Sequence, residues 1–322
     1  MKAVVATGYG PPELFTVADV EVPRPGQGQI RVRIAAAALN PVDLKLAAGD
    51  MRAMVELPFP HVLGNDFAGT VTETGPGVTA FQAGDELFGH AMPRALRPIA
   101  GRQRPSLGTG TLAEFAVMEA DTPFITRRPA GLSPADAAAL GTAGLTARAL
   151  ALTAAIQPGE TVLVVGATGG VGTAVLPLLR AAKAHIIATG RPGDDELLGG
   201  LGADQVVEYA QAGDVTGVDV ALNLVLPSDQ LAGVARTLRP GGRLYTITFP
   251  VPRQEWAARE DITFDLVLDT DGRLGGMREV ADLATGGDLT ATIGRTYSLG
   301  EGPRAYVDLA RRHTVGKLVV LP

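Results

Sequence analysis

The sequence contains no cysteine in 322 residues. This absence excludes disulfide bonds, thiolate nucleophiles, iron–sulfur ligation and every zinc site built on cysteine. Histidine is scarce as well, and the four residues of this type are scattered without the spacing of metal ligands: His61, His90, His185 and His313. The sequence therefore offers neither cysteine-based chemistry nor a recognisable histidine metal site.

Long apolar runs and a positive charge excess are also missing. The alanine-rich stretch 133–156 comes nearest to a membrane span, but Asp136 and Arg148 interrupt it, which favours a pair of amphipathic helices. The first residues lead directly into a glycine-proline turn without the apolar core of an export signal, so we expect a cytoplasmic protein. A net charge of −6 argues against a nucleic-acid partner. We therefore expect neither nucleic acid nor a membrane as a partner.

The length favours two domains, because 322 residues exceed one ordinary globular domain. Residues 2–123 show short strand signals broken by glycine and proline, which predicts a partly open β-barrel. From about residue 131, strand-like segments alternate with helical ones and predict a doubly wound parallel sheet, in an α/β fold. The end of the chain returns to strand signals. We expect a first domain of residues 1–124 with 288–322, and a second of residues 125–287.

Residues 161–191 have the pattern strand, glycine turn, helix, strand. After the strand and Gly166, the turn matches G-x-G-x-x-G with alanine at the first position, over Ala167, Thr168, Gly169, Gly170, Val171 and Gly172. Gly169 allows the backbone to approach a pyrophosphate, Gly172 allows the helix to pack, and the helix amino terminus supplies free N–H groups. The pattern predicts a dinucleotide site; the alternative is a packing turn without a ligand.

The end of the second strand indicates which dinucleotide binds. It carries Thr189, Gly190 and Arg191, with no acidic residue to bond a ribose 2′-hydroxyl. A guanidinium suits a 2′-phosphate, so NADP(H) is the predicted cofactor. Asp194 and Asp195 follow closely and oppose this assignment, and Arg191 as a solvated surface residue is the alternative.

Nearly the whole chain resembles the medium-chain dehydrogenase/reductase superfamily, in its zinc-independent quinone oxidoreductase branch, which includes zeta-crystallin. The residues that carry the resemblance are 1–50, LGNDFAGTVTETGPGVTAFQAGDELFG (63–89), GTLAEFAV (110–117), GLTARAL (144–150), QPGETVLVVGATGGVGTAVLPLL (157–179), LGADQVVEY (201–209), LRPGGRLYTI (238–247) and HTVGKLVVLP (313–322). The resemblance implies a GroES-like barrel, a Rossmann domain, a cleft between them and a homodimer.

Asn40 and Asn65 stand where zinc-dependent members of the superfamily have metal ligands. An amide binds zinc poorly compared with a thiolate or an imidazole, and the lobe of four cysteines that holds structural zinc in those members is missing. The resemblance therefore implies metal-free chemistry. Without a Lewis acid, an activated acceptor such as a quinone or an α,β-unsaturated carbonyl is the substrate we expect, with hydride supplied by NADPH.

Asn40 is the predicted neutral donor for the developing oxyanion, although an Asn-Pro turn cap is an equally good role for it. Asp43 is predicted to support this loop. Relatives often carry a tyrosine in the following segment, where this chain has Lys45 and Met51, so a tyrosine acid does not carry over. Lys45 as proton donor, Lys45 as a solvated surface residue, and protonation by water all remain open.

The resemblance and strand-end positions assign the remaining site residues. Asn65, Met92 and Thr142 are expected in the substrate pocket, and Asn223, Phe249 and Lys317 near the cofactor. Residues 90–110 form a long connection that carries four arginines: Arg94, Arg97, Arg102 and Arg104. This connection predicts either a lid for an acidic or phosphorylated substrate or a plain surface loop.

Two alternatives to a quinone or enone reductase stay open. Asn223 stands where many quinone reductases have aspartate, as in polyketide enoyl reductases, which favours an enoyl or ketide reductase of a biosynthetic pathway. The missing tyrosine favours a non-catalytic NADPH-binding protein.

Overall fold

The computed structural model describes residues 1–101 and 103–322, so Arg102 of the predicted lid lies outside the described residues. The chain forms two compact units. Unit 1 comprises residues 1–142, 270–285 and 291–322, and unit 2 comprises residues 143–269 and 286–290.

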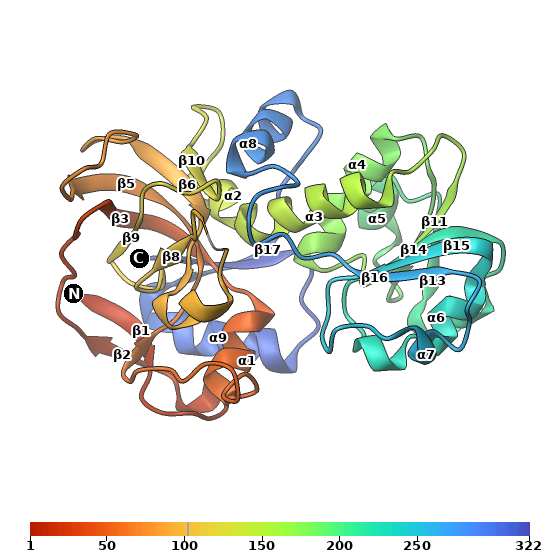
Figure 1. The fold of residues 1–322 in the computed structure, drawn as a ribbon, viewed down its shortest axis with the longest axis horizontal. Helices are drawn as coiled ribbons and strands as arrows, with labels where there is room; N and C mark the ends of the chain where they lie inside the picture. Colours follow the sequence, from red (N-terminus) through yellow and green to blue (C-terminus); the bar gives the residue numbers. More distant parts are fainter. Residues whose placement is uncertain (102) are drawn as a thin grey trace. The chain divides into compact units, whose positions relative to one another are not determined.

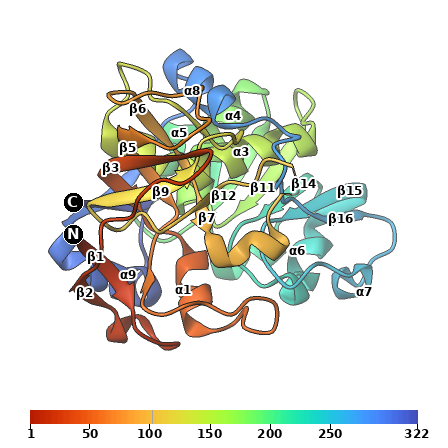
Figure 2. The same ribbon diagram turned by 60° about the vertical axis from the view of Figure 1, so that its left-hand side comes forward.

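Unit 1 is built on a sheet whose central strand β3 (Gln29–Ala38) pairs with β5 (Asp66–Thr74) and β9 (Phe115–Glu119), and the three strands lie side by side in Figures 1 and 2. Its other strands are β6 (Glu86–His90), β7 (Met92–Pro93), β8 (Leu107–Gly108), β10 (Ile125–Arg127), β17 (Ile293–Ser298) and β18 (Lys317–Leu321). A smaller sheet contains β1 (Lys2–Ala6), β2 (Thr16–Asp19) and β4 (His61–Val62). The predicted GroES-like barrel is confirmed. The end of the chain rejoins it, because β18 pairs with β3.

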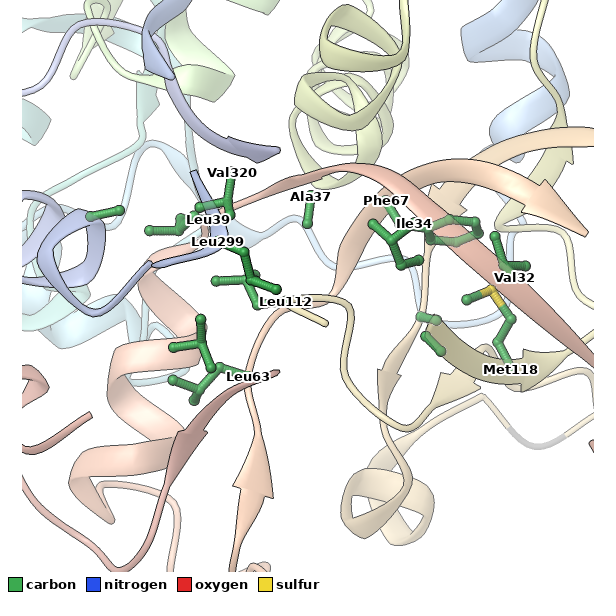
Figure 3. Close-up of a cluster of buried hydrophobic side chains, with 14 of the residues drawn as sticks. Val32, Ile34, Ala37, Leu39, Leu63, Phe67, Leu112, Met118, Leu299 and Val320 are labelled. Carbon is green, nitrogen blue, oxygen red and sulfur yellow. The ribbon is translucent and has the colours of Figure 1, made fainter. Parts of the chain in front are cut away.

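Alternating burial along β3 explains why this strand lies at the centre of unit 1. Ile30, Val32 and Ile34 point into the core while the arginines between them point outward. Figure 3 shows Ile34 beside Phe67, with Val32 near Met118, in one apolar cluster. Burying each side chain of this size stabilises the folded barrel by about 1.5–3 kcal/mol.

Unit 2 contains a parallel sheet in the order β13-β12-β11-β14-β15-β16, which confirms the predicted Rossmann-like fold; Figure 2 shows β14, β15 and β16 side by side. The strands are β11 (Thr161–Val165), β12 (His185–Gly190), β13 (Gln205–Glu208), β14 (Val218–Asn223), β15 (Leu238–Thr246) and β16 (Thr263–Leu266). The helices connecting them include α4 (Gly170–Ala181), α5 (Asp195–Leu201), α6 (Ala232–Thr237) and α7 (Gln254–Ala257). Continuous apolar runs such as TVLVV suit strands that are buried on both faces.

The remaining helices belong mainly to unit 1 and to the start of unit 2. They are α1 (Pro41–Ala48), α2 (Pro134–Ala139), α3 (Gly141–Ala154), α8 (Met277–Gly286) and α9 (Gly302–Arg311). Short 3-10 helices are η1 (Pro12–Leu14), η2 (Arg94–Ile99), η3 (Tyr209–Asp214), η4 (Ser228–Gln230) and η5 (Leu299–Glu301). The alanine-rich stretch does form two helices. Over the part of the chain that the structure describes, no helix combines the length and the apolar character needed to cross a membrane.

The boundaries of the units differ from the domain limits expected at residues 124 and 288. Unit 1 continues to Thr142 because β10 pairs with β6 and because α2 packs its buried alanines on β3 and β5. Residues 270–285 also belong to it, and the N–H of Met277 donates to the carbonyl of Pro123 at 2.8 Å. Helices cover this barrel as well as the parallel sheet, so a change from strand to helix signals does not mark the boundary.

Candidate active site

Asn40 lies at the end of β3, directly before α1. Its backbone is extended, and Pro41 begins the helix with a φ that is already suitable. The helix ends at Gly49, whose φ of 89° is in the left-handed region that favours glycine. The N–H of Asn40 donates to Oδ2 of Asp43 at 3.0 Å. This bond belongs to a capping box that Asn40 and Asp43 form at the start of the helix.

The amide of Asn40 is held by two charged groups. Its Oδ1 accepts from Nζ of Lys317 at 2.6 Å, and its Nδ2 donates to Oδ2 of Asp66 at 2.8 Å. An ammonium only donates and a carboxylate only accepts, so the amide cannot be reversed. One N–H of Nδ2 remains with no hydrogen-bond acceptor among the described residues. Asn40 therefore starts the helix and also carries a fixed amide donor, so both roles expected for it stay open.

Asp66 is the acceptor at the centre of this cluster and is completely buried. Its Oδ1 accepts from the backbone N–H and the hydroxyl of Thr142 at 2.9 and 2.7 Å and lies 2.9 Å from Nδ1 of His90. Lys317 lies 3.5 Å from its Oδ2. Burial alone would raise the pKa of Asp66, but Lys317 and His90 outweigh that effect and lower it to about 2. Asp66 is therefore a fixed negative charge.

Asp43 is a second buried carboxyl group, on the first turn of α1. Besides the N–H of Asn40, its Oδ2 accepts from the hydroxyl of Tyr306 at 2.9 Å, and its Oδ1 accepts from Nδ2 of Asn65 at 2.8 Å. Burial raises the pKa of Asp43 to about 6, against the opposing effect of the bonds from Asn40 and Tyr306. The same burial, with the nearby Asp43, raises the pKa of Tyr306 well above its ordinary range, so this tyrosine stays protonated.

The structure brings together five of the residues that sequence reasoning selected: Asn40, Asp43, Asn65, Thr142 and Lys317. Lys317 was expected near the cofactor; in the structure its ammonium lies inside the cluster, within unit 1. Lys45 is exposed, two positions after Asp43 on α1 and thus on another face of the helix. Met92 packs on an apolar cluster formed by Leu46, Val55, Leu57 and Leu96.

Sequence reasoning missed Asp66, His90 and Tyr306. Asp66 was detectable, because a carboxylate that begins the apolar strand DFAGTV needs a partner inside the protein. His90 was set aside as one of several scattered histidines. Tyr306 lies 263 residues from Asp43 in the sequence, so no local pattern could have connected them.

Two arginines of the predicted lid have acidic partners. Arg97 lies 3.6 Å from Glu119, and Arg104 lies 2.6 Å from Asp121. Leu96, directly before Arg97, is buried in the apolar cluster with Leu46. These pairs weaken the argument for a segment that attracts an acidic substrate.

The glycine turn of unit 2 has the geometry that a dinucleotide requires. Gly166 has a φ of 95°, and its N–H donates to the hydroxyl of Thr189 at 2.9 Å. A Cβ at Gly172 would lie 2.4 Å from the carbonyl oxygens of Gly166 and Ala167, whereas the nearest atom to a Cβ at Gly169 would be 3.5 Å away. No side chain caps the amino terminus of α4. The turn therefore presents open space and free N–H groups, which fits a pyrophosphate.

The other residues expected at the cofactor lie on the same edge of the parallel sheet. Arg191 is exposed directly after β12, and its backbone N–H donates to Oδ2 of Asp194 at 2.8 Å. Asn223 is completely buried, and its Nδ2 donates to the hydroxyl of Thr246 at 2.9 Å, so its amide connects the ends of β14 and β15 within unit 2. Phe249 is 47% exposed, beyond the end of β15.

Comparison with known proteins supports a GroES-like unit and a dehydrogenase unit in this chain. Residues 26–129 match the family model of the alcohol dehydrogenase GroES-like domain, and residues 201–320 match the model described as zinc-binding dehydrogenase. The chloroplast envelope quinone oxidoreductase homolog of Arabidopsis thaliana is 31% identical over 328 residues, covering 94% of this chain and 93% of that protein.

Two further relatives are informative. The 2-methylene-furan-3-one reductase of Solanum lycopersicum is 36% identical over 214 residues, which cover 66% of this chain and 53% of that protein. Among solved structures, a mycobacterial protein complexed with NADPH superposes with a TM-score of 0.84 at 26% identity, over the full length of both chains.

A barrel with a buried polar cluster, together with a parallel sheet carrying a dinucleotide-type turn, defines an oxidoreductase of the dehydrogenase/reductase class. The chain belongs to the medium-chain dehydrogenase/reductase superfamily, in its quinone oxidoreductase branch.

The zinc-binding family description raises the question of whether this cluster fits a metal ion. The two positions at which zinc-dependent members carry ligands hold the amides of Asn40 and Asn65, and the buried ammonium of Lys317 lies 2.6 Å from Oδ1 of Asn40. Among the residues that the structure describes, no group of three or more histidine, aspartate or glutamate side chains is placed to hold a metal ion. An ammonium that donates to this oxygen occupies one of its two lone pairs, and its positive charge repels a second cation. The donor set does not fit a catalytic zinc ion.

Proposed function

We propose that this protein is an NADPH-dependent reductase of quinones or α,β-unsaturated carbonyl compounds that acts without a metal ion. The observation that carries the proposal is the locked amide of Asn40, which Lys317 and Asp66 hold from opposite ends. A neutral donor fixed in a buried site stabilises negative charge as it develops on a carbonyl oxygen.

NADPH, when bound, supplies the hydride. The chain's own part is to hold the second N–H of Asn40 toward the carbonyl oxygen on which negative charge accumulates. The ammonium of Lys317, 2.6 Å from Oδ1, polarises the amide and strengthens this N–H as a donor. Water is the proton source in this proposal, because Lys45 is exposed on another face of α1.

NADPH is favoured over NADH by Arg191, which is exposed directly after β12 with no acidic residue at the strand end. The structural relative in complex with NADPH supports the same cofactor. The glycine turn from Gly166 to Gly172 would hold the pyrophosphate. Relatives named for quinones and for a methylene-furanone support the substrate class. The homodimer and the cytoplasmic location remain predictions.

The first test is NADPH oxidation at 340 nm against a panel of quinones, 2-alkenals and enoyl thioesters, with NADH and EDTA controls. We expect EDTA-insensitive turnover of a quinone or an alkenal with a preference for NADPH. Turnover of enoyl thioesters alone would instead indicate a biosynthetic enoyl reductase. Tight NADPH binding with no turnover on the whole panel would indicate a non-catalytic protein.

The role of Asn40 is tested with Asn40→Ala and Asn40→Ser. Loss of a fixed oxyanion donor lowers kcat by roughly 100- to 1000-fold. NADPH affinity should stay unchanged, because the glycine turn is intact. Gln27→Ala, which removes an exposed amide from the same unit, is the matched control. If Asn40→Ala and Asn40→Ser fold and retain wild-type kcat, the donor role is wrong.

A further inference from the structure

Asn65 has a buried atom that lacks a partner. The residue is 1% exposed, and its Nδ2 donates to Oδ1 of Asp43 at 2.8 Å. Its Oδ1 has no hydrogen-bond partner among the described residues. An unpaired buried acceptor costs about 1–3 kcal/mol, so the arrangement needs a reason.

The two oxygens of Asp43 are occupied unequally. Oδ2 accepts two bonds, from the N–H of Asn40 at 3.0 Å and the hydroxyl of Tyr306 at 2.9 Å. Oδ1 accepts only the amide of Asn65. A proton taken up by Asp43 therefore goes to Oδ1, because both lone pairs of Oδ2 are engaged.

A proton on Oδ1 changes what Asp43 requires of Asn65. Two donors would then face each other across 2.8 Å, the O–H of Asp43 and the N–H of Asn65. A half-turn of the amide about its last side-chain bond replaces Nδ2 by Oδ1 with almost no change of shape, and the O–H···O bond is made. The same turn moves Nδ2 to the place where Oδ1 had no partner.

We propose that Asn65 is a positioning residue whose amide reverses with the charge of Asp43, so that its unpartnered atom is an oxygen acceptor when Asp43 is ionised and an N–H donor when it is protonated. Asn65 and Asp43 together then decide whether the buried cluster offers a ligand a hydrogen-bond acceptor or a hydrogen-bond donor. An acceptor, such as a carbonyl gaining negative charge, is matched by the protonated state.

The charged surroundings of Asp43 make both states accessible. Burial, together with the buried Asp66 on β5, raises its pKa to about 6, against the opposing effects of the bonds from Asn40 and Tyr306 and of Lys317 on β18. The other charged groups of the elements packed on α1 are engaged elsewhere. On α9 and its C-terminal cap, Arg304 and Arg312 form ion pairs with Asp308. Arg311 forms an ion pair with Glu13 of η1. Lys45, on α1 itself, is exposed.

Neighbouring Asn40 cannot reverse in the same way, because Lys317 and Asp66 hold its two ends. Asn65 has an anchor at one end only. Within one cluster, therefore, one amide has fixed polarity and the other has a polarity set by a proton.

Selective ¹⁵N labelling of asparagine tests the proposal in the protein without ligand, since the chain has only Asn40, Asn65 and Asn223. The side-chain NH₂ signals of Asn65, assigned by their loss in Asn65→Ser, should titrate between about pH 5 and 7, within a unit or so of the value for Asp43. Nuclear Overhauser contacts from these hydrogens to the Asp43 β-protons should be present at high pH and lost at low pH. Asn223, in unit 2, is the internal control.

Tyr306→Phe is the discriminating variant. It removes one donor to Oδ2, which gives the proton a second place to bind, so Asp43 should still titrate while reversal of Asn65 weakens. Contacts between Asn65 and Asp43 that persist unchanged through the titration of the wild type would overturn the proposal. So would Asn65 signals that do not respond to pH.

A kinetic measurement adds an arm that rests on the proposed function. The pH profile of kcat/KM should have an inflection that Asp43→Asn removes, since this substitution imitates the protonated carboxyl. Reversal seen by NMR in a protein that reduces no member of the panel would support the switch and count against the reductase. Turnover with a pH-insensitive Asn65 would do the opposite.

Discussion

Replacing Lys317 by methionine removes a buried cation from the Asn40 cluster while keeping a side chain of similar length. In the structure the ammonium is 7% exposed and donates to the carbonyl of Leu39 and to Oδ1 of Asn40, both at 2.6 Å. It also lies 3.5 Å from Asp66, whose charge is completely buried. Lys317→Met leaves two acceptors and one carboxylate without this partner.

Breaking a buried ion pair by removing one partner costs about 3–5 kcal/mol. We expect a loss of this size in the free energy of opening of unit 1, since methionine replaces the volume but none of the hydrogen bonds. At about 1.4 kcal/mol per factor of ten, hydrogen exchange should speed up by roughly two to three and a half orders of magnitude. The pKa of Asp66 should rise at the same time, because Lys317 is the largest of the effects that lower it.

Hydrogen exchange followed by mass spectrometry measures the free energy of opening of unit 1 on peptides from β3 and β18, which are paired in the sheet. Lys2→Met is the matched control, because Lys2 bonds Asp19 on the surface of the same unit, and we expect little change there. Adding Asp66→Asn to Lys317→Met should recover part of the loss, as the uncompensated charge is then removed. A Lys317→Met protein as stable as Lys2→Met would refute the reasoning.

Three further outcomes are expected. As pH rises from about 4 through about 6, the raised pKa of Asp43 means that stability is lost, since only the unfolded state readily releases this proton; urea titrations across this window should show the decline, and Asp43→Asn should flatten it. Gly172→Ala should destabilise unit 2, because its Cβ would meet carbonyl oxygens at 2.4 Å, whereas Gly169→Ala should fold normally and bind NADPH more weakly in calorimetry. If Gly169→Ala binds as wild type, the turn does not contact the pyrophosphate. Arg191→Gln should raise KM for NADPH about tenfold with little effect on NADH, a loss of roughly 1.4 kcal/mol, and equal effects on both cofactors would contradict its role.

Much of the fold followed from patterns that lie within single elements. Apolar runs separated by helical segments predicted the parallel sheet from β11 to β16, and the glycine spacing predicted the turn before α4. Domain limits did not follow, because α2 and residues 270–285 pack on the barrel through contacts with distant strands. Local periodicity carries no information about which surface an element will cover.

Some residues of the candidate site were also predicted from the sequence, and others were not. Asn40 and Asp43 were selected through the family resemblance, and in the structure their three-residue spacing at a helix start places the carboxylate near the backbone N–H of Asn40. His90 and Tyr306 were not identified, since their partners lie 24 and 263 residues away. A pair of residues so far apart leaves no signal in either segment.

The sequence by itself determined the kinds of groups available: no thiol, amides at Asn40 and Asn65, and a glycine turn suited to a dinucleotide. The tertiary structure decided which of these groups are charged, locked or unpaired. Burial and the ends of distant strands place Lys317 against Asn40, and give Asp43 a pKa of about 6 while that of Asp66 falls to about 2. Those differences arise from desolvation and from charges brought together by folding, which no local stretch of sequence contains.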